Sequence, residues 1–167
     1  MDNTSALTAV RSTMEMSSYV TGFIDGEGSF LVSFSKRAKM FTGLEVRPAF
    51  TASQHERNKG ILIALRRFLR CGSVRFNKRD STWKYEVRGL NDLLEKIVPH
   101  FDAFPLQTSK RSDFERFKRI CFLMKSGSHL RHDGVRTIIE LAYEMNNLGA
   151  RRQNKSDLLR LIGKMKV

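Results

Sequence analysis

Polar and apolar residues alternate along four short stretches of the chain. The first two, residues 30–37 and 44–51, have the two-residue period of β-strands with one buried face, and the polar segment 36–43 joins them. The next two stretches, 73–77 and 82–88, are joined by a short polar turn. Each pair of stretches therefore predicts an antiparallel hairpin.

A predicted helix precedes each of these hairpins. The first helix is expected to begin at a capping serine, Ser17 or Ser18, and to run to about Gly26. The second begins near Arg57 and is expected to end at Gly72, because glycine commonly closes a helix. The resulting order is two α-β-β units in tandem.

The remaining helices follow the second hairpin. One covers residues 91–98 and is expected to end at Pro99, since a proline disfavours helical geometry in the residue before it. Three more helices occupy the C-terminal part from about residue 112, and the last is expected to be capped by Ser156 or Asp157. Their apolar stripes, interpreted as core, are Phe114, Phe117, Ile120, Cys121 and Met124; Val135, Ile138, Ile139, Ala142 and Met145; and Leu158, Leu159 and Ile162.

The element order αββαββα defines the fold class. Four antiparallel strands with helices packed on one side give an α+β fold whose sheet keeps one free face, followed by C-terminal helices. Residues 17–167 are expected to form a single domain, and the Ser- and Thr-rich residues 1–16 are expected to form a flexible N-terminal arm.

The polar positions of the four strands have a composition suited to nucleic acid. Arginine and lysine side chains pair with guanine, asparagine with adenine and glutamate with cytosine, while serine and threonine contact any base. A solvated sheet face would also be polar, so both interpretations stand on this feature alone. The residues predicted to contact DNA are Ser33, Ser35, Arg37, Glu45, Arg47, Thr51, Arg75, Asn77, Lys84, Glu86 and Arg88.

The charge balance favours a polyanionic partner. The 30 lysines and arginines outnumber the 17 acidic residues, which gives a formal net charge of +13. Such a balance points most often to nucleic acid and less often to an anionic membrane. No apolar stretch approaches the roughly eighteen residues of a membrane span, and a secretory signal is not expected. Cys71 and Cys121, without a CxxC spacing, are interpreted as packing residues of a reducing compartment.

Two glycines lie four residues apart near the end of the first predicted helix. Gly22 and Gly26 share one helical face, and each costs about 1 kcal/mol relative to alanine in a helix interior. Together with Thr21 they keep that face small, which suits a second helix that approaches at backbone distance. A chance pair of glycines at a helix end is the alternative interpretation.

Two acids follow the glycines, and they are interpreted separately because residues two apart cannot share a helical face. Glu27 lies at the helix C-terminus, where its charge is unfavourable by about 0.3–1 kcal/mol. A divalent cation would offset this repulsion, because the Glu27 carboxylate and the Gly26 carbonyl both supply oxygen ligands suited to Mg²⁺. Two copies of the helix packed through their glycine faces would bring two Glu27 side chains together, an arrangement suited to cutting phosphodiesters.

The segment VTGFIDGEG at 20–28 resembles the signature of the LAGLIDADG homing endonucleases, with Tyr19 before it and Ser29 after it. Val20 and Thr21 replace the usual leucine and alanine. The αββαββα order also resembles this family, from Ser18 to about Lys125. The chain holds one copy of the motif and has the length of one-motif members. The resemblance therefore implies a homodimer whose first helices pack together and whose two sheets form a saddle over DNA.

The resemblance also implies roles for single residues of the motif and of the second strand. It makes Glu27, with Gly26, the metal-binding acid of each subunit. It assigns Asp25 to the dimer interface, beside Thr21, Gly22 and Gly26, or to the helix end. Gln54 corresponds to a glutamine that orients water near the scissile phosphate. Many members have a basic residue four positions later, where this chain has Asn58, followed by Lys59.

A third catalytic residue is implied in the segment 104–111. This segment resembles the one that carries an active-site lysine forward in the family, which indicates Lys110, with Arg111 as the alternative.

The implied reaction is hydrolysis of both strands of double-stranded DNA with Mg²⁺, for which Mn²⁺ or Ca²⁺ can substitute in binding. Cleavage across the minor groove leaves short 3′ overhangs in a long pseudo-palindromic target. Neither a membrane nor a small-molecule substrate is expected, and expression in a chloroplast, a mitochondrion or a bacterial cytoplasm is expected. Three alternatives stay open: a catalytically silent DNA-binding regulator, an RNA-binding intron maturase and a basic structural RNA-binding protein.

Overall fold

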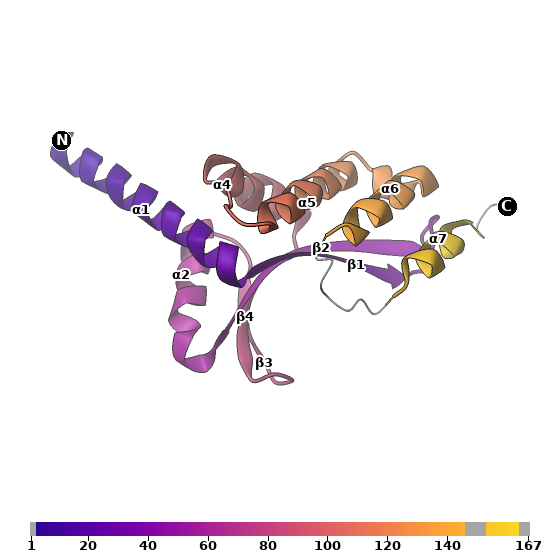
Figure 1. The fold of residues 1–167 in the computed structure, drawn as a ribbon, viewed down its shortest axis with the longest axis horizontal. Helices are drawn as coiled ribbons and strands as arrows, with labels where there is room; N and C mark the ends of the chain where they lie inside the picture. The colour runs from indigo at the N-terminus through magenta and orange to yellow at the C-terminus, as the bar shows by residue number, and fades with distance from the viewer. Residues whose placement is uncertain (1–2, 146–152, 164–167) are drawn as a thin grey trace.

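The computed structural model describes residues 3–145 and 153–163 (Figure 1). A four-stranded antiparallel sheet in the order β1-β2-β4-β3 lies beneath a layer of helices, which confirms the predicted α+β class. In chain order the strands and main helices are α1 (Asn3–Glu27), β1 (Gly28–Lys36), β2 (Leu44–His55), α2 (Lys59–Leu69), β3 (Ser73–Asn77), β4 (Thr82–Val87), α3 (Leu90–Asp92), the π-helical η2 (Leu93–Ile97), α4 (Val98–Ala103), α5 (Lys110–Lys125), α6 (His132–Tyr143) and α7 (Lys155–Gly163).

The long strand β2 joins the two hairpins into one sheet. Its first part pairs with β1, from Leu44 opposite Lys36 to Ala52 opposite Gly28. Its second part pairs with β4, and β4 pairs with β3. Both hairpins lie where the two-residue pattern predicts them, because that pattern depends only on which face of each strand is buried.

Phenylalanine rings fill the space between the sheet and the helices. Phe30 and Phe50 from the sheet meet Phe101, Phe114 and Phe117 from the helices, and all five side chains are at most 2% exposed. The ring centroids of their contacting pairs lie 5.3–5.7 Å apart. Such aromatic pairs add about 0.5–1.5 kcal/mol each to the stabilisation from burial. These rings fix the helices over one face of the sheet.

The prediction that the first helix begins at Ser17 or Ser18 is wrong. Helix α1 begins at Asn3, so residues 3–16, predicted as a flexible arm, continue the helix and project from the body of the molecule (Figure 1). The Ser17 hydroxyl does not cap a helix start, because it donates to the Thr13 carbonyl one turn earlier at 2.9 Å. A serine in mid-helix makes this bond, which the sequence alone does not distinguish from a cap.

Two other predicted helix boundaries are also wrong. The helix before Pro99 does not end there but continues as α4 to Ala103. The π-helical turn η2 precedes the proline, and Pro99, which lacks an N–H, lies in the first turn of α4. At α7, Asn154 rather than Ser156 or Asp157 supplies the cap, since its Oδ1 accepts the Ser156 N–H at 3.0 Å. The predicted stripes are buried, except that Met124 in the first and Leu159 in the third are only partly buried.

No helix in the described ranges 3–145 and 153–163 is long and apolar enough to cross a membrane.

The turn between α2 and β3 requires glycine at position 72. Arg70 already adopts a left-handed conformation at the end of α2, and Gly72 follows with φ of +75°. A Cβ atom on Gly72 would lie 2.7 Å from the Glu86 carbonyl oxygen and 2.7 Å from Val87 Cγ2. The turn therefore holds the start of β3 directly against β4.

We expect Gly72→Ala to lower the free energy of unfolding by about 1–3 kcal/mol, because alanine strains the left-handed backbone and collides with β4. Gly60→Ala is the matched control, since a Cβ on Gly60 meets nothing within 4 Å. The control should change stability by no more than about 1 kcal/mol, in the stabilising direction. Urea denaturation of both variants measures the difference, and equal stability of the two would contradict this account of the turn.

Candidate functional site

Helix α1 passes into strand β1 without a connecting loop. Val20 and Ile24 are fully buried and hold the last turns of the helix against the core. The helix ends at Glu27 and the strand begins at Gly28. A Cβ atom on Gly28 would lie 2.5 Å from Ile24 Cγ2 and 2.9 Å from the Ile24 carbonyl oxygen, so only glycine allows this abrupt change of direction. The end of α1 therefore has a fixed position relative to the sheet.

Asp25 binds the segment that leads into α5. Its carboxylate accepts the Gln107 N–H at 2.7 Å, the Thr108 N–H at 3.2 Å and the Thr108 hydroxyl at 2.7 Å. Burial raises the pKa of Asp25, but the hydrogen bonds from Thr108 and Gln107 and the charge of Lys110 outweigh it and hold that pKa below its ordinary value. Asp25 is therefore an ionised anchor within its own chain.

Lys110 lies against the C-terminal end of α1. Its Nζ donates to the Ile24 carbonyl at 2.9 Å, where the helix leaves carbonyl groups without intrahelical partners. Partial burial lowers the pKa of Lys110, although the charges of Asp25 and Glu27 act in the opposite direction. Arg111 instead is exposed and lines a groove with residues of α5 and α6. The geometry thus brings Lys110, and not Arg111, to the end of the motif helix.

Glu27 is exposed at the same helix end and has no hydrogen bond or ion pair with any residue that the structure describes. Gly26 beside it is also exposed. A free carboxylate next to helix-end carbonyls offers the oxygen ligands that Mg²⁺ prefers. Within the described part of the chain, however, no three His, Cys, Asp or Glu side chains gather as a metal site. One chain therefore supplies a fitting but incomplete ligand set.

Gln54 lies at the sheet end nearest this site. It is two residues beyond Ala52, the partner of Gly28 in the first hairpin. Its Oε1 accepts a hydrogen bond from Asn58 Nδ2 at 3.1 Å. Lys59 is directed elsewhere, because its Nζ lies 3.4 Å from the centre of the Trp83 ring. Asn58 thus orients Gln54, while Lys59 does not replace the basic residue expected at position 58.

The glycine face of α1 is open. A Cβ atom on Gly22 or Gly26 would meet nothing within 4 Å, and both glycines are exposed. A groove of about 340 Å³ runs beside Gly22. Ser18, Thr21, Gly22, Asp25, Ala103, Phe104, Pro105 and Gln107 line it. Tyr19 is 54% exposed next to this groove. Nothing within the described chain accounts for the two helix-weakening glycines.

Thr21 and Asp25, predicted at the same interface, instead bind their own chain. Thr21 is 7% exposed, and its hydroxyl donates to the Phe104 carbonyl at 3.1 Å and lies 3.2 Å from His100 Nε2. Burial lowers the pKa of His100 to about 4, so this contact involves a neutral ring at neutral pH. The prediction for Thr21 is therefore corrected. Ser18 was missed, although its spacing of four from Gly22 places it on the glycine face.

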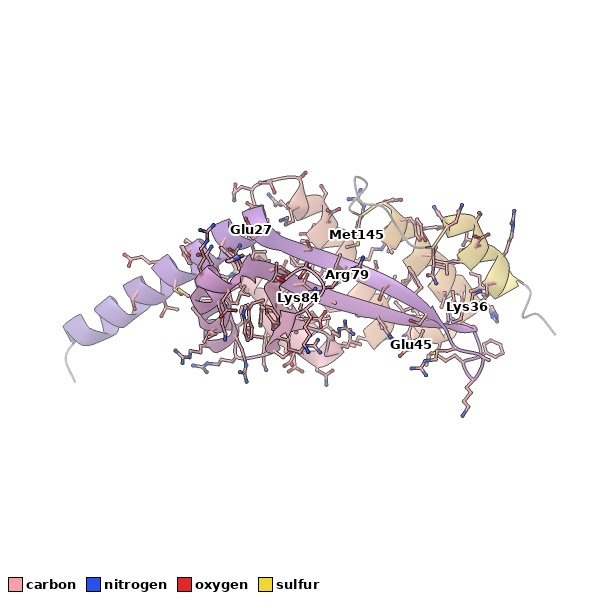
Figure 2. The ribbon with its side chains drawn as sticks, turned by 90° about the horizontal axis from the view of Figure 1, so that it is seen from below. Glu27, Lys36, Glu45, Arg79, Lys84 and Met145 are labelled. Carbon is pink, nitrogen blue, oxygen red and sulfur yellow. The ribbon has the colours of Figure 1, made fainter. Side chains whose placement is uncertain are left out.

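The residues predicted to contact DNA lie on one face of the sheet. Strand register places Ser33 opposite Arg47 and Ser35 opposite Glu45 on the first hairpin. The same phase continues across the sheet, with Thr51 opposite Glu86 and Arg75 opposite Lys84. Seen from below in Figure 2, Glu27 lies where α1 meets the sheet, and Lys36 and Glu45 lie at the far end of the hairpin. The predicted contact residues thus extend outward from Glu27.

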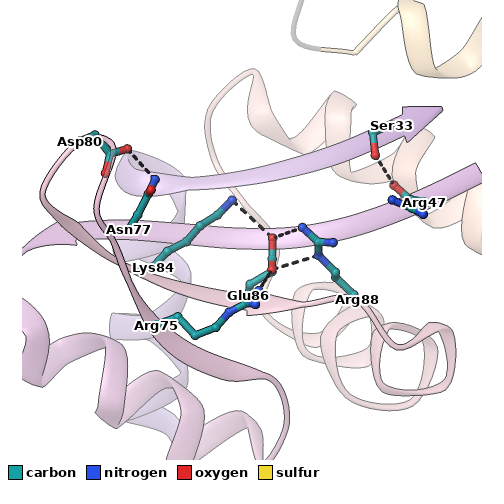
Figure 3. A network of polar contacts seen from close by, with 8 residues as sticks. All are labelled: Ser33, Arg47, Arg75, Asn77, Asp80, Lys84, Glu86 and Arg88. Atoms are coloured by element: carbon teal, nitrogen blue, oxygen red, sulfur yellow. Dashed lines mark hydrogen bonds and ion pairs between the residues drawn. The ribbon is translucent and has the colours of Figure 1, made fainter. Parts of the chain in front are cut away.

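Two carboxylates on this face bind its cations. Glu45 accepts from Arg37 Nε at 2.8 Å and from Arg47 Nη2 at 2.7 Å, and these hydrogen bonds lower the pKa of Glu45. Glu86 binds a second group of cations near the middle of the sheet (Figure 3). The sequence predicted both acids as base readers, but it gave no indication that they bind neighbouring arginines.

A comparison with known protein families shows which family this chain belongs to. The model described as LAGLIDADG endonuclease matches residues 20–121, which is more than half of the 167 residues. The chain belongs to the LAGLIDADG endonuclease family. The matched span runs from the last turns of α1, which hold the motif, through both hairpins and into α5, which begins at Lys110.

Individual LAGLIDADG relatives differ from this chain in length. A Neurospora crassa protein named probable intron-encoded endonuclease 2 is 32% identical over 123 residues, which are 74% of this chain and 26% of the relative. The chain spans about a quarter of the length of the first curated relatives that it matches.

Solved structures of homing endonucleases match nearly all of this chain, and the match covers either nearly all or about half of the other chain. The homing endonuclease I-TnaI is similar with a TM-score of 0.78 and 39% identity, over 90% of this chain and 97% of that chain. I-SmaMI bound to an uncleaved DNA target in the presence of calcium ions is similar with a TM-score of 0.79 and 30% identity. This second match covers 89% of this chain and 49% of the I-SmaMI chain.

The two acids of the LAGLIDADG motif should differ in their effect on stability. We expect Asp25→Asn to lower the free energy of unfolding by about 1–3 kcal/mol, because an amide nitrogen would face one of the N–H groups that Asp25 now accepts. Glu27→Gln should change it by less than about 0.5 kcal/mol, since the Glu27 carboxylate has no partner among the described residues. Thermal unfolding monitored by circular dichroism compares the two variants, and a larger loss in Glu27→Gln would refute the separation of roles.

Proposed function

We propose that this LAGLIDADG chain is a site-specific homing endonuclease that acts as a homodimer on double-stranded DNA. The observation that carries the proposal is the end of α1, where an unpartnered Glu27 lies beside Lys110 on a helix whose glycine face is open. Within the described part of one chain, neither the Glu27 carboxylate nor the open glycine face makes a stabilising contact. A pair of chains joined at the glycines gains a shared acidic site at the centre of two basic sheet faces.

The open glycine face supports the homodimer. Gly22 and Gly26 together cost about 2 kcal/mol of helix stability, which a closely packed second helix can offset. The matches also support pairing, because this chain covers 97% of the I-TnaI chain but only 49% of the I-SmaMI chain. Two copies of this chain therefore have about the length of I-SmaMI. A two-fold protein implies a long, pseudo-palindromic target.

The proposed cofactor is a divalent metal ion, with Mg²⁺ for cleavage and Mn²⁺ or Ca²⁺ as substitutes in binding. Glu27 and the Gly26 carbonyl of each subunit would hold it. The I-SmaMI complex with an uncleaved target in the presence of calcium ions supports this choice. When bound, the cation stabilises the negative charge that develops on the attacked phosphate.

The remaining chemistry belongs to Lys110 and Gln54. In phosphodiester hydrolysis a water oxygen forms a bond to phosphorus, the bond to the leaving oxygen breaks, and that oxygen gains a proton. Gln54, held by Asn58, orients the water. Lys110, held by the Ile24 carbonyl, offsets the charge of the phosphate in the transition state. Cleavage of both strands across the minor groove leaves short 3′ overhangs.

The sheet face supplies affinity and sequence preference. Its arginines and lysines attract the phosphate backbone, so binding should weaken steeply as salt concentration rises. Side chains that reach the base edges give the preference for one sequence. The relatives named as intron-encoded support a role in intron homing, and an organellar or bacterial location stays a prediction.

We expect Glu27→Gln to abolish double-strand cleavage, by at least about a hundredfold, while DNA binding in Ca²⁺ stays within a few-fold of wild type. The amide keeps the size of the side chain but is a poor cation ligand. Glu140→Gln, an equal change at an exposed position of α6, is the control and should cleave normally. Plasmids carrying candidate intron insertion sites, incubated with Mg²⁺, measure cleavage. Full activity of Glu27→Gln, or no cleavage by wild type with any divalent metal, would contradict the enzyme and favour a silent DNA-binding regulator or a maturase.

We expect Gly22→Leu to convert the dimer to a monomer, because a leucine side chain cannot fit between two helices at backbone distance. Gly60→Leu is the matched control, since Gly60 is also an exposed helical glycine with open space around its Cα. Sedimentation velocity gives the oligomeric state of both variants. A dimer that persists in Gly22→Leu would place the interface elsewhere.

A further inference from the structure

Glu86 is buried on the polar face of the sheet, as is Thr51 opposite it, whereas the arginines around it are exposed. It lies on β4, between β2 and β3, and is 5% exposed. Arg75 and Arg88 on the same face are 65% and 61% exposed. Figure 3 shows the cause: the side chains of Arg75, Lys84 and Arg88 converge on the Glu86 carboxylate from three sides.

Both oxygens of this carboxylate are occupied. Oε1 accepts from Arg88 Nη2 at 3.0 Å and lies 3.4 Å from Lys84 Nζ. Oε2 lies 2.9 Å from Arg88 Nε and also accepts from Arg75 Nη2. Arg88 therefore forms a two-pronged contact, the geometry that fixes a guanidinium most firmly. Both oxygens are paired with cations and the side chain is 5% exposed, so the sequence prediction that Glu86 accepts a hydrogen bond from a base is corrected.

The cluster keeps a positive charge after this pairing. Burial raises the pKa of Glu86, but the hydrogen bonds and charges of Arg88 and Lys84 lower it below its ordinary value, so the carboxylate is ionised. Three cations against one carboxylate leave two positive charges. Each guanidinium has five N–H donors and the ammonium has three, so most donors remain free for another acceptor.

We propose that Glu86 is a positioning residue that holds Arg75, Lys84 and Arg88 as one guanine-reading unit, so that each half of the target contains guanine opposite this part of the sheet. The proposal rests on the proposed function and adds the chemistry of one subsite. Guanine presents two acceptors, O6 and N7, in the major groove, and arginine or lysine is their usual donor. A phosphate would also accept from these cations, but it does not require them to be held in one orientation.

Glu86 gives specificity by fixing side chains before DNA binds. A free arginine or lysine loses rotamer entropy when it is immobilised, and adjacent like charges repel. With Glu86 in place, the three side chains are already ordered before DNA binds. They therefore lose less rotamer entropy when they contact a base. Glu45 binds Arg37 and Arg47 similarly, but Glu45 itself is 30% exposed, and an exposed ion pair holds its partners less firmly.

The test is selection of bound sequences from a library of random double-stranded DNA in Ca²⁺, with wild type and Glu86→Gln. We expect wild type to enrich guanine at a symmetric pair of positions and Glu86→Gln to lose about tenfold of that preference. The variant should bind random duplex as tightly as wild type or more tightly, because its cations are released to reach phosphates. Glu95→Gln, an equal charge change at an exposed residue of η2, is the control and should keep the preference.

Three results would overturn the proposal. One is an unchanged guanine preference in Glu86→Gln, and another is uniform weakening on all sequences, which indicates a purely structural role. The third is a wild-type preference without guanine at the affected positions. Failure of the sequence-specific DNA binding on which the proposal rests has a different signature, because wild type itself would then enrich no sequence. Loss of cleavage alone is detected by the plasmid assay and does not change the result of this selection.

Arg88→Lys provides a second variant if Glu86→Gln does not fold. It keeps the charge and leaves Glu86 with three cations, but lysine cannot form the two-pronged contact. We expect loss of guanine preference at one symmetric position, with the thermal unfolding temperature and the affinity for random duplex close to wild type. An unchanged preference in Arg88→Lys would also refute the proposal.

Discussion

The junction between α1 and β1 is the constraint on which the rest of the structure depends. Gly28 lets the chain turn directly from helix to strand, and Asp25 and Lys110 attach the start of α5 to the same helix end. A helix and a sheet joined without a loop move as one body. Any partner that docks on Gly22 and Gly26 therefore sets the position of Glu27 and of the whole sheet face together.

Charge is the second constraint, because a chain with a formal net charge of +13 brings like charges close together on its surface. The sheet face carries two acids, each placed among arginines. Glu45 is partly exposed near the tip of the first hairpin, and Glu86 is buried near the middle of the sheet. The acids reduce repulsion within each cluster and also decide which way the cationic groups point.

Local patterns predicted most of the fold. Both hairpins and the stripes of α5 and α6 follow from periodicity, because burial of one face is a property of each segment. The boundaries that failed depend on contacts or geometry that a pattern does not contain. Ser17 resembles a cap but bonds to Thr13 within a continuous helix, and Pro99 is tolerated because a π-helical turn precedes it.

The site was predictable only in part. The glycine spacing and the position of Glu27 at the helix end are visible in the sequence, and the structure agrees with both. The sequence could not place Thr21 against His100 or Asp25 against Thr108, because these partners are about eighty residues away. The sequence also predicted a DNA contact for Glu86, because Glu86 lies on the polar side of its strand. Its ion pairs with Arg75 and Arg88 depend on which strands pair and on side-chain length, and the sequence pattern shows neither.

The central claim is that two Glu27 side chains from two chains form one cleavage site. Its most direct test is a titration of the cleavage rate with subunits mixed by co-expression, in which wild type and Glu27→Gln are varied at constant total protein. If both acids are required together, mixed dimers cut neither strand, and the total rate of strand cutting, nicks included, falls with the square of the wild-type fraction. A rate that falls in simple proportion to that fraction would mean that each chain cuts independently, and the account would be wrong.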